Sequence, residues 1–472
     1  MDIEHLLRGL YPYADKYGVV RTFPEKGLSR EEVLEQIDYM ATKEDATWED
    51  GSCSGTMYCG DHDHYDFLNK VSARYSHVNS IQRDMCLSMS RFESEIIAMT
   101  LDMMHGSAVK EHHPGESACG AVGFGGTESI LNAMLVYRDK AKAERGITAP
   151  ELIMPDTAHA AFVKAGHLFN IKVILAPVDP DTTQVDLDFV KANINDNTVA
   201  LVGSAGNYPY GTIDPISELS EIALEHNIGL HVDGCLGGFI LPWGEALGYD
   251  IPVFDFRLPG VTSMSADSHK YGYGLKGTSV ILYRDKSFRQ YQYFAWPDWK
   301  GGAYASNGLP GSRSGGIIAA TWASMISLGR EGYLKHAKEI FETAFKMQDA
   351  VKSHPELKLM GKPTWCFSFT GEEINIYHVN DFMVQRGWRF NGQQNPDAIH
   401  MCVTRPQTLE GVADRFVADL ADAVEYAKNP PKPEPDSGGI YGGGAAGLDM
   451  DDPEIVRTFL YGAMDAMSEY PF

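Results

Sequence analysis

Two lysines lie six residues apart in the stretch 265-SADSHKYGYGLKGTSVILYR-284. Lys270 directly follows Ser-His, and Lys276 lies in a Gly-Leu-Lys-Gly turn before the apolar run SVILYR. A lysine amine can bond to an aldehyde, and a charged lysine binds anions. Because Lys270 comes at the end of the strand-like run 261-VTSMSAD-267, it is a candidate for chemistry at the end of a strand.

A glycine-rich turn, 123-GFGGTESI-130, opens a strongly helical stretch. Glycine lets the backbone approach a ligand closely, and the first turn of a helix offers unpaired N–H groups and the positive end of the helix dipole. With the hydroxyls of Thr127 and Ser129, this turn has the parts of a phosphate-binding site. An ordinary strand-to-helix turn explains it equally well. Its glycine spacing does not match the dinucleotide-binding fingerprint.

A third candidate is Asp233, which ends the strand-like run in 230-LHVDGCLGGFILPW-243. A single aspartate at a strand end is commonly a cap or turn residue, although ligands in open α/β sheets bind at the carboxyl ends of strands. Together, the glycine-rich turn, Asp233 and Lys270 supply what pyridoxal phosphate requires. The lysine binds the aldehyde, the carboxylate pairs with the ring nitrogen, and the helix N-terminus holds the phosphate.

The elements that must position these residues alternate between helix and strand from about residue 90 to 330. Helical periodicity is found at 91–106, 127–146 and 216–227. Short apolar runs typical of buried strands lie at 151–155, 172–178, 198–205, 228–234, 261–267 and 278–283. This alternation predicts an α/β fold with a mostly parallel sheet.

The 472 residues divide into four expected segments: an N-terminal arm (1–90), a large cofactor-binding domain (91–335), a small α+β domain (336–430), and a glycine-rich tail with a terminal helix (431–472). In the arm, Ser29 is a plausible N-cap for a helix at 29–41. The small domain combines helices and strand-like runs at 331–354, 366–371, 400–404 and 409–428. The stretch 429–447 has the composition of a flexible linker, and 453–470 predicts a helix.

Charge and cysteine usage restrict the function classes. The net charge of −24 argues against nucleic acid and anionic membrane surfaces as partners. Seven widely spaced cysteines without a CxxC pattern suit a reducing compartment. With no signal-peptide pattern and no run of about 18 apolar residues, we expect a cytoplasmic protein without a membrane span. The stretches 61-DHDHYD-66 and 111-EHHPGE-116 predict exposed loops and no metal site, because neither offers four ligands.

The motifs resemble those of the sphingosine-1-phosphate lyases, within the group II pyridoxal-dependent decarboxylases. The resemblance extends from about residue 50 to 445 and rests on 126-GTESI, 159-HAAF, 231-HVDGCLGG, 265-SADSHKYGYGLKGTSVILY, 298-DWKGGAYAS, 311-GSRSGG and 440-IYG. It implies a fold-type I pyridoxal-phosphate enzyme with a mostly parallel seven-stranded sheet and a small C-terminal domain. It also implies a homodimer whose active sites lie at the subunit interface.

Carried over position by position, the resemblance assigns Lys270 as the lysine that binds the cofactor and Asp233 as the partner of its ring nitrogen. His159 would lie over one face of the ring and Cys235 near the other. The expected phosphate contacts are Gly126, Thr127, His269 and Ser312 of the partner subunit.

On the substrate side, Lys276 resembles the residue that serves the substrate phosphate and proton handling. A solvated turn lysine is the alternative. Tyr58, in 54-SGTMY-58, and Tyr441, in the glycine-rich tail, match further catalytic positions. The tail would then be a lid over the site and not a linker.

The chain departs from the family pattern where a His-Pro-Asp stretch supplies a histidine to the substrate pocket. Asn79 is retained, but Gln82 replaces the histidine and Arg83 replaces the proline. Glutamine can form hydrogen bonds but cannot carry a proton at neutral pH. Arg83 can supply the missing cation if it points into the pocket. Gly234 also replaces the usual alanine after Asp233.

The activity implied by the resemblance is carbon–carbon cleavage of a phosphorylated sphingoid base into a fatty aldehyde and ethanolamine phosphate. An amino-acid decarboxylase with the same cofactor is the alternative, and Gln82 favours some change of substrate. A third reading, a non-catalytic scaffold, predicts loss of Lys270 or Asp233, and both are present.

Overall fold

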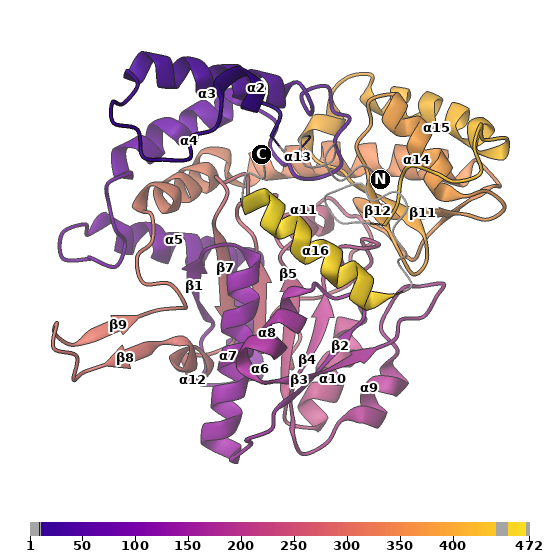
Figure 1. Ribbon diagram of the computed structural model, residues 1–472. Helices are drawn as coiled ribbons and strands as arrows, with labels where there is room; N and C mark the ends of the chain where they lie inside the picture. Colours follow the sequence, from indigo (N-terminus) through magenta and orange to yellow (C-terminus); the bar gives the residue numbers. More distant parts are fainter. Residues whose placement is uncertain (1–8, 10, 440–451, 469–472) are drawn as a thin grey trace.

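A seven-stranded sheet lies at the centre of the computed structural model, which describes residue 9 and residues 11–439 and 452–468 (Figure 1). The strand order is β1-β7-β6-β5-β4-β2-β3. β7 runs antiparallel to both neighbours, and the other pairs are parallel. The strands are Cys119–Gly123 (β1), Glu151–Pro155 (β2), Lys172–Ala176 (β3), Thr198–Ser204 (β4), Gly229–Gly234 (β5), Ser263–Ala266 (β6) and Ser279–Tyr283 (β7). The predicted mostly parallel seven-stranded sheet is confirmed.

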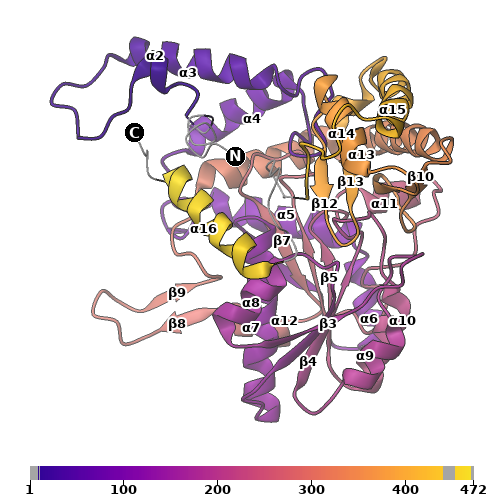
Figure 2. The ribbon, with the colours of Figure 1, turned by 45° about the vertical axis from the view of Figure 1, so that its right-hand side comes forward.

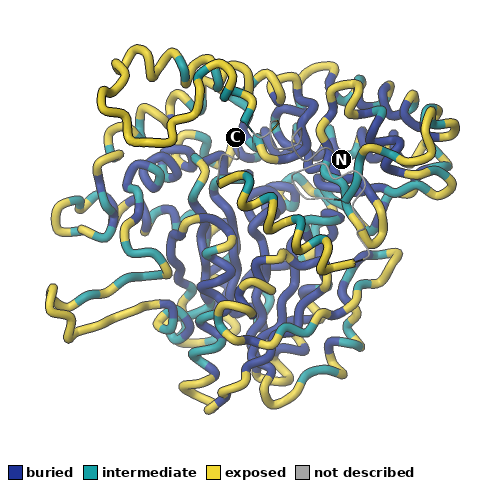
Figure 3. Tube along the Cα trace, in the orientation of Figure 1, coloured by how far each residue is buried: buried dark blue, intermediate teal, exposed yellow. Residues whose placement is uncertain are grey.

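Helices cover both faces of this sheet, so most of its strands are buried along their whole length (Figure 3). One apolar core lies between the sheet and α7 (Gly126–Arg145) and α8 (Ala161–Phe169). The core on the other face includes residues of α5 (Ser88–Met103), α9 (Leu187–Asn193), α10 (Ile216–Glu225), α11 (Leu241–Ala246) and α13 (Gly315–Lys352). Neighbouring residues of one strand therefore enter different cores, as Leu201 and Val202 of β4 do.

A second, four-stranded antiparallel sheet forms the small domain, in the order β10-β11-β13-β12. Its strands are Leu357–Leu359 (β10), Cys366–Gly371 (β11), Asn391–Gln393 (β12) and Ala398–Cys402 (β13). It is accompanied by α14 (Ile376–Gln385) and α15 (Val412–Lys428). Long helix α13 joins the two domains, with non-helical backbone at Gly329. The expected domain boundary at 335 therefore falls inside one helix.

The N-terminal arm carries α2 (Ala14–Tyr17), α3 (Arg30–Asp45) and α4 (His62–Tyr75). Ser29 caps α3 in a capping box with Glu32, which confirms the predicted N-cap. A β8–β9 hairpin (Phe294–Trp296 and Tyr304–Ser306) projects from the body in two views (Figures 1 and 2). The remaining short helices are α6 (Val109–His112) and α12 (Lys286–Arg289), and α16 (Pro453–Ser468) ends the described chain. Among the described helices, none is both long and apolar enough to cross a membrane.

Two expectations about local structure were wrong. The stretch 61–66 begins helix α4 and is not a loop, because Asp61 caps the helix by accepting a hydrogen bond from His64 N. The helix expected at 331–354 is confirmed, because the backbone of α13 is non-helical at Gly329 and the part of α13 after this break ends at Lys352. The start of the expected linker is tied down, since Asp381 of α14 accepts bonds from the backbone N–H groups of Asp436 and Ser437.

The contact between the two domains is tight at Gly211, which lies in the loop between β4 and α10 and packs against β11 of the small domain. Its φ is +68°, and a Cβ at this position would lie 1.8 Å from Cys366 O of β11. Gly248 has a similar φ of +85°, but a Cβ there would meet nothing within 4 Å. Replacing Gly211 and Gly248 by alanine therefore separates two effects: both substitutions strain the backbone, but only the one at Gly211 also causes a steric clash.

We expect Gly211→Ala to destabilise the protein by at least about 2 kcal/mol more than Gly248→Ala, because only the first substitution forces the domains apart. Thermal or urea unfolding of both variants beside the parent protein measures the difference. Equal losses of stability would show that the two domains do not meet as described.

Candidate active site

The candidate site lies at the edge of the large sheet where β5 and β6 end. Asp233 is the second-last residue of β5, and Asp267 directly follows β6. The parallel register pairs Asp233 with Ser265, so both strand ends reach the same edge. Lys270 follows three residues after Asp267, in the turn that leads to β7. This edge is where open α/β sheets bind ligands.

Asp233 is a buried carboxylate with one of its oxygens fully engaged. Its Oδ1 accepts hydrogen bonds from Cys235 N (2.9 Å) and Ser265 Oγ (3.1 Å). Burial by itself would raise the pKa of Asp233, but the positive charges that His159 and His231 carry when protonated, together with hydrogen bonds from Cys235, outweigh it and the pKa is lowered. Burial also raises the pKa of the Cys235 thiol well above its ordinary value, so this neighbour stays neutral.

Lys270 forms an ion pair with Asp267, with 2.9 Å between Nζ and Oδ2. Burial opposes the charge of Lys270, but the Asp267 carboxylate outweighs that effect and raises the pKa of the lysine well above its ordinary value. Asp267 itself is buried, and its Oδ1 has no hydrogen-bond partner. An unpartnered carboxylate oxygen beside a reactive lysine is a feature of a site built around a ligand.

The glycine-rich turn contributes the third part of the site. Helix α7 begins at Gly126 without a side-chain cap, so its first N–H groups face outward from the helix end. A Cβ at Gly126 would lie 2.6 Å from Asp267 Oδ2 and 2.8 Å from Cys235 Sγ, and one at Gly125 would lie 3.3 Å from His269 Cε1. The turn thus lies against the two strand ends. Thr127 and His159 are exposed beside it.

Aromatic residues around the lysine turn hold it in place. Tyr271 OH donates to Val403 O (2.6 Å) and accepts from Trp365 Nε1 (2.6 Å), which ties the residue after Lys270 to the small domain. The carbonyl of Gly272 accepts bonds from Ser324 Oγ and Tyr333 OH of α13, both at 2.9 Å. The turn is therefore anchored from both domains, which keeps the two lysines at fixed positions.

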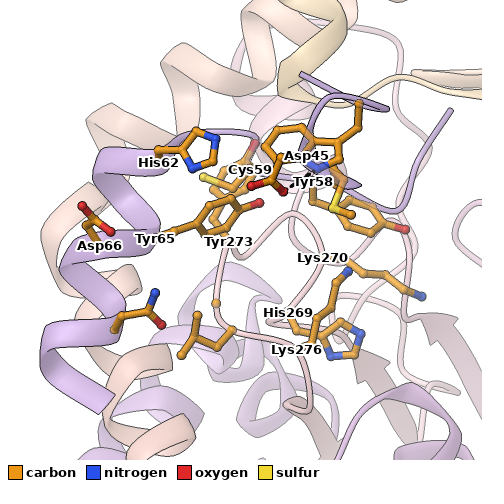
Figure 4. A pocket seen from close by; sticks show the side chains of 15 residues that line it. Asp45, Tyr58, Cys59, His62, Tyr65, Asp66, His269, Lys270, Tyr273 and Lys276 are labelled. Atoms are coloured by element: carbon orange, nitrogen blue, oxygen red, sulfur yellow. Dashed lines mark hydrogen bonds between the residues drawn. The ribbon is translucent and has the colours of Figure 1, made fainter. Parts of the chain in front are cut away.

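Lys276 and Tyr58 meet in a pocket of about 360 Å³ that Lys270 also lines (Figure 4). Lys276 Nζ donates to Thr56 O (2.9 Å) and lies 4.6 Å from the centre of the Tyr58 ring. Lys276 is exposed when its whole surface is counted, but its amine is held at the pocket wall by the bond to Thr56 O. There, burial and the repulsion from Lys270 lower its pKa to about 8. A lysine with this pKa carries a proton at neutral pH and can also release it.

Three other predicted site residues, Asn79, Arg83 and Ser312, lie close together but do not line this pocket. Asn79 Nδ2 donates to Ser312 Oγ (2.9 Å), and Asn79 Oδ1 accepts from Arg313 N (3.2 Å). Glu93, which is buried, forms ion pairs with both Arg313 and Arg83. The guanidinium of Arg83 is thus bound to Glu93, so it is not the free pocket cation that the sequence suggested.

The remaining predicted positions are less informative. Gln82 is exposed and does not line the 360 Å³ pocket. Tyr441 lies outside the described residues. In 61-DHDHYD-66, Asp61 pairs with Arg405 and His64 with the carbonyl of Tyr273.

Sequence reasoning overlooked two features of this site. Asp267 was inside the quoted motif, three residues before Lys270, and its place at a strand end was the available signal. His62 lies close to Asp45 and Glu49 at the rim of the pocket, where their potential metal-ligand atoms fall within 4.8 Å of one another. Because this second group joins two different helices, no local sequence pattern marks it.

The lowered pKa of Lys276 predicts its chemical reactivity in the cofactor-free protein. Acetic anhydride reacts only with a neutral amine, so Lys276 should reach half-maximal labelling near pH 8, against about 10.4 for an ordinary lysine. Mass spectrometry of labelled peptides gives the profile. In Lys270→Ala, the loss of one repelling charge should move the Lys276 profile to higher pH. A profile identical to that of surface lysines would contradict the described pocket.

Comparison with known proteins identifies the family. A family model described as the pyridoxal-dependent decarboxylase conserved domain matches residues 15–369. The sphingosine-1-phosphate lyase of Arabidopsis thaliana is 42% identical over 458 residues, which are 96% of this chain and 82% of that protein. The enzyme of the same name from Dictyostelium discoideum is 40% identical and covers 94% of this chain and 82% of its own.

Solved structures agree with this assignment. The structure of Burkholderia pseudomallei sphingosine-1-phosphate lyase matches with a TM-score of 0.92 and 59% identity, covering 98% of this chain and 100% of the other. Glutamate decarboxylase of Lactobacillus brevis has a TM-score of 0.75 at 19% identity over 89% of this chain and 98% of its own, which shows the shared fold alone. The chain belongs to the pyridoxal-dependent decarboxylase family and, within it, to the sphingosine-1-phosphate lyases.

Proposed function

We propose that this protein is a pyridoxal-phosphate-dependent carbon–carbon lyase that splits phosphorylated sphingoid bases into a fatty aldehyde and ethanolamine phosphate. The observation that carries the proposal is that Lys270, Lys276 and Tyr58 line one pocket, with the amine of Lys276 4.6 Å from the centre of the Tyr58 ring. The first lysine suits the cofactor, and the second suits a phosphorylated substrate. The lyases of Burkholderia pseudomallei and Arabidopsis thaliana resemble this chain along nearly its whole length.

The residues present fit pyridoxal phosphate. The start of α7 has no side-chain cap, so its first backbone N–H groups can bind a phosphate. Asp267 Oδ1 is a buried oxygen without a hydrogen-bond partner. Asp233 offers a buried carboxylate on the same sheet edge. When bound, this cofactor supplies an aldehyde for amines and a ring that accepts the electrons released when a carbon–carbon bond breaks.

Lys270 would bind the cofactor aldehyde, and Asp233 would keep the ring nitrogen protonated. His159 and Cys235 would lie at the two ring faces. The proposed phosphate contacts are Gly126, Thr127 and His269. In support, the Cys235 thiol lies next to both Asp233 and Lys270, close enough for their charges to act on its ionisation.

Proton handling falls to the second lysine. Cleavage removes a proton from the 3-hydroxyl, breaks the C2–C3 bond and later returns a proton to C2. With a pKa of about 8, Lys276 can attract the substrate phosphate in its charged form and exchange a proton near neutral pH. Lys270, which lies beside Asp267 at the same sheet edge, would be the other candidate proton donor.

We also propose a homodimer in which the Asn79–Ser312 group completes the site of the neighbouring subunit. These two side chains are hydrogen-bonded to each other but do not line the pocket of their own chain. Gln82 and Arg83 belong to the same loop, so their departure from the family pattern would bear on the partner's substrate.

A product assay tests the proposed reaction. The cofactor-loaded protein is mixed with sphingosine 1-phosphate, with unphosphorylated sphingosine as the control substrate. We expect a long-chain aldehyde together with ethanolamine phosphate from the first substrate and little product from the second. If the loaded protein yields neither product and instead releases carbon dioxide from amino acids, the decarboxylase alternative is correct.

Substitutions at the two lysines should have different effects. Lys270→Ala should abolish covalent attachment of the cofactor, measured by mass spectrometry after borohydride reduction, and all turnover. Lys276→Ala should keep the attached cofactor but lower kcat/KM for the phosphorylated substrate by about 100-fold or more. Lys338→Ala, at an exposed lysine of α13, is the control. Unchanged cleavage by Lys276→Ala would refute its role.

A further inference from the structure

A line of buried polar side chains runs behind Asp233 along the same face of the sheet. His231 and Asp233 alternate on β5, and Ser263 and Ser265 alternate on β6. The parallel register sets His231 directly beside Ser263 and Asp233 directly beside Ser265. Polar residues at four adjacent positions are unusual for strands covered on both faces, where continuous apolar runs are the rule.

These side chains form one continuous hydrogen-bond chain. From its far end, Tyr137 OH contacts Ser263 Oγ (2.5 Å), and Ser263 Oγ contacts His231 Nδ1 (2.7 Å). His231 Nε2 contacts Ser265 Oγ (3.3 Å), which in turn contacts Asp233 Oδ1 (3.1 Å). Each member is at most 7% exposed.

The donor-to-acceptor direction of these hydrogen bonds can be worked out from the Asp233 end. The Asp233 carboxylate can only accept, so Ser265 Oγ must donate to it. Ser265 can then accept the proton of His231 Nε2, which leaves Nδ1 as the acceptor for Ser263 Oγ–H. Ser263 can in turn accept from Tyr137 OH, which also contacts Thr262 Oγ1 (2.7 Å). The bonds from Ser263 onward therefore all point their hydrogens toward Asp233, and aligned bonds of this kind polarise one another.

His231 and Tyr137 keep the protonation that this direction needs. Burial lowers the pKa of His231 to about 4, so its imidazole is neutral near neutral pH and has one donor and one acceptor nitrogen. Burial raises the pKa of Tyr137 to about 12, so its hydroxyl keeps its proton. The titratable groups outside this hydrogen-bond chain that act on its members include His159, Arg284 and Cys235, and Cys235 Sγ also contacts Ser265 Oγ at 3.2 Å.

We propose that His231 is a positioning residue which, through Ser265, fixes Asp233 Oδ1 and leaves Oδ2 to face the ring nitrogen of the cofactor. The proposal rests on the proposed function only in taking pyridoxal phosphate as the cofactor. Oδ1 already accepts two hydrogen bonds, from Cys235 N and Ser265 Oγ. A carboxylate held this way presents one oxygen in a set orientation and retains its charge inside the protein.

Packing alone does not account for His231. The ring lies edge-on to Phe162 of α8, with 5.7 Å between ring centres, so an apolar side chain would fill this place at least as well. Both of its nitrogens are used in hydrogen bonds. The prediction is therefore specific: substitutions should act on the cofactor through its ring nitrogen and not through general loss of stability.

The test compares the dissociation constants of pyridoxal phosphate and of its analogue in which a C–H group replaces the ring nitrogen. Ser265→Ala and His231→Leu should weaken binding of pyridoxal phosphate about tenfold or more and leave binding of the analogue nearly unchanged. His231→Gln, which can still donate to Ser265, should restore most of the affinity. Ser220→Ala is the matched control, because it removes a buried serine hydroxyl that bonds only to Gly260 N on another element.

Equal weakening for both ligands, or none for either, would overturn the role of His231. If His231→Leu does not fold, Ser265→Ala decides the question, since it removes only one hydroxyl. If the parent protein binds neither ligand, the proposed function fails, and the inference fails with it. Parent binding together with unaffected variants refutes the inference alone.

Discussion

A buried negative charge at the end of β5 is the constraint on which the rest of this structure depends. An isolated carboxylate in a protein interior is strongly disfavoured and tends to take up a proton. Asp233 avoids this because a backbone N–H and a serine hydroxyl donate hydrogen bonds to it, and its pKa stays below the ordinary value. The parallel register of β5 and β6 makes that arrangement possible, since it sets Ser265 directly beside Asp233.

The same sheet edge gives two lysines different properties. Lys270 lies beside the Asp267 carboxylate, which stabilises the positive charge of Lys270. Lys276 is different, because burial and the nearby charge of Lys270 destabilise its positive charge. Their separation is maintained by Tyr271, which is anchored to the small domain, and by Gly272, which is anchored to α13. Tyr271 and Gly272 therefore have a structural role: they hold Lys270, proposed to bind the cofactor, and Lys276, proposed to bind the substrate, at separate positions.

Local patterns predicted much of this protein and non-local contacts explain the rest. The strands, the glycine-rich turn, Asp233 and Lys270 were recognisable because periodicity and strand-end position are properties of short stretches. The pairing of Arg83 with Glu93 was not, because the two residues lie in a loop and a separate helix that meet only in the folded chain. Likewise, Asp61 was assigned to a loop because a helix cap depends on the backbone that follows it.

The central claim is that Asp233 stays ionised in the interior and holds a proton on the ring nitrogen of the cofactor. The most direct measurement is the ¹⁵N chemical shift of that nitrogen in labelled pyridoxal phosphate bound to the protein. We expect the shift of a protonated nitrogen at neutral pH, and its loss in Asp233→Asn. An unprotonated nitrogen in the parent protein would contradict the account.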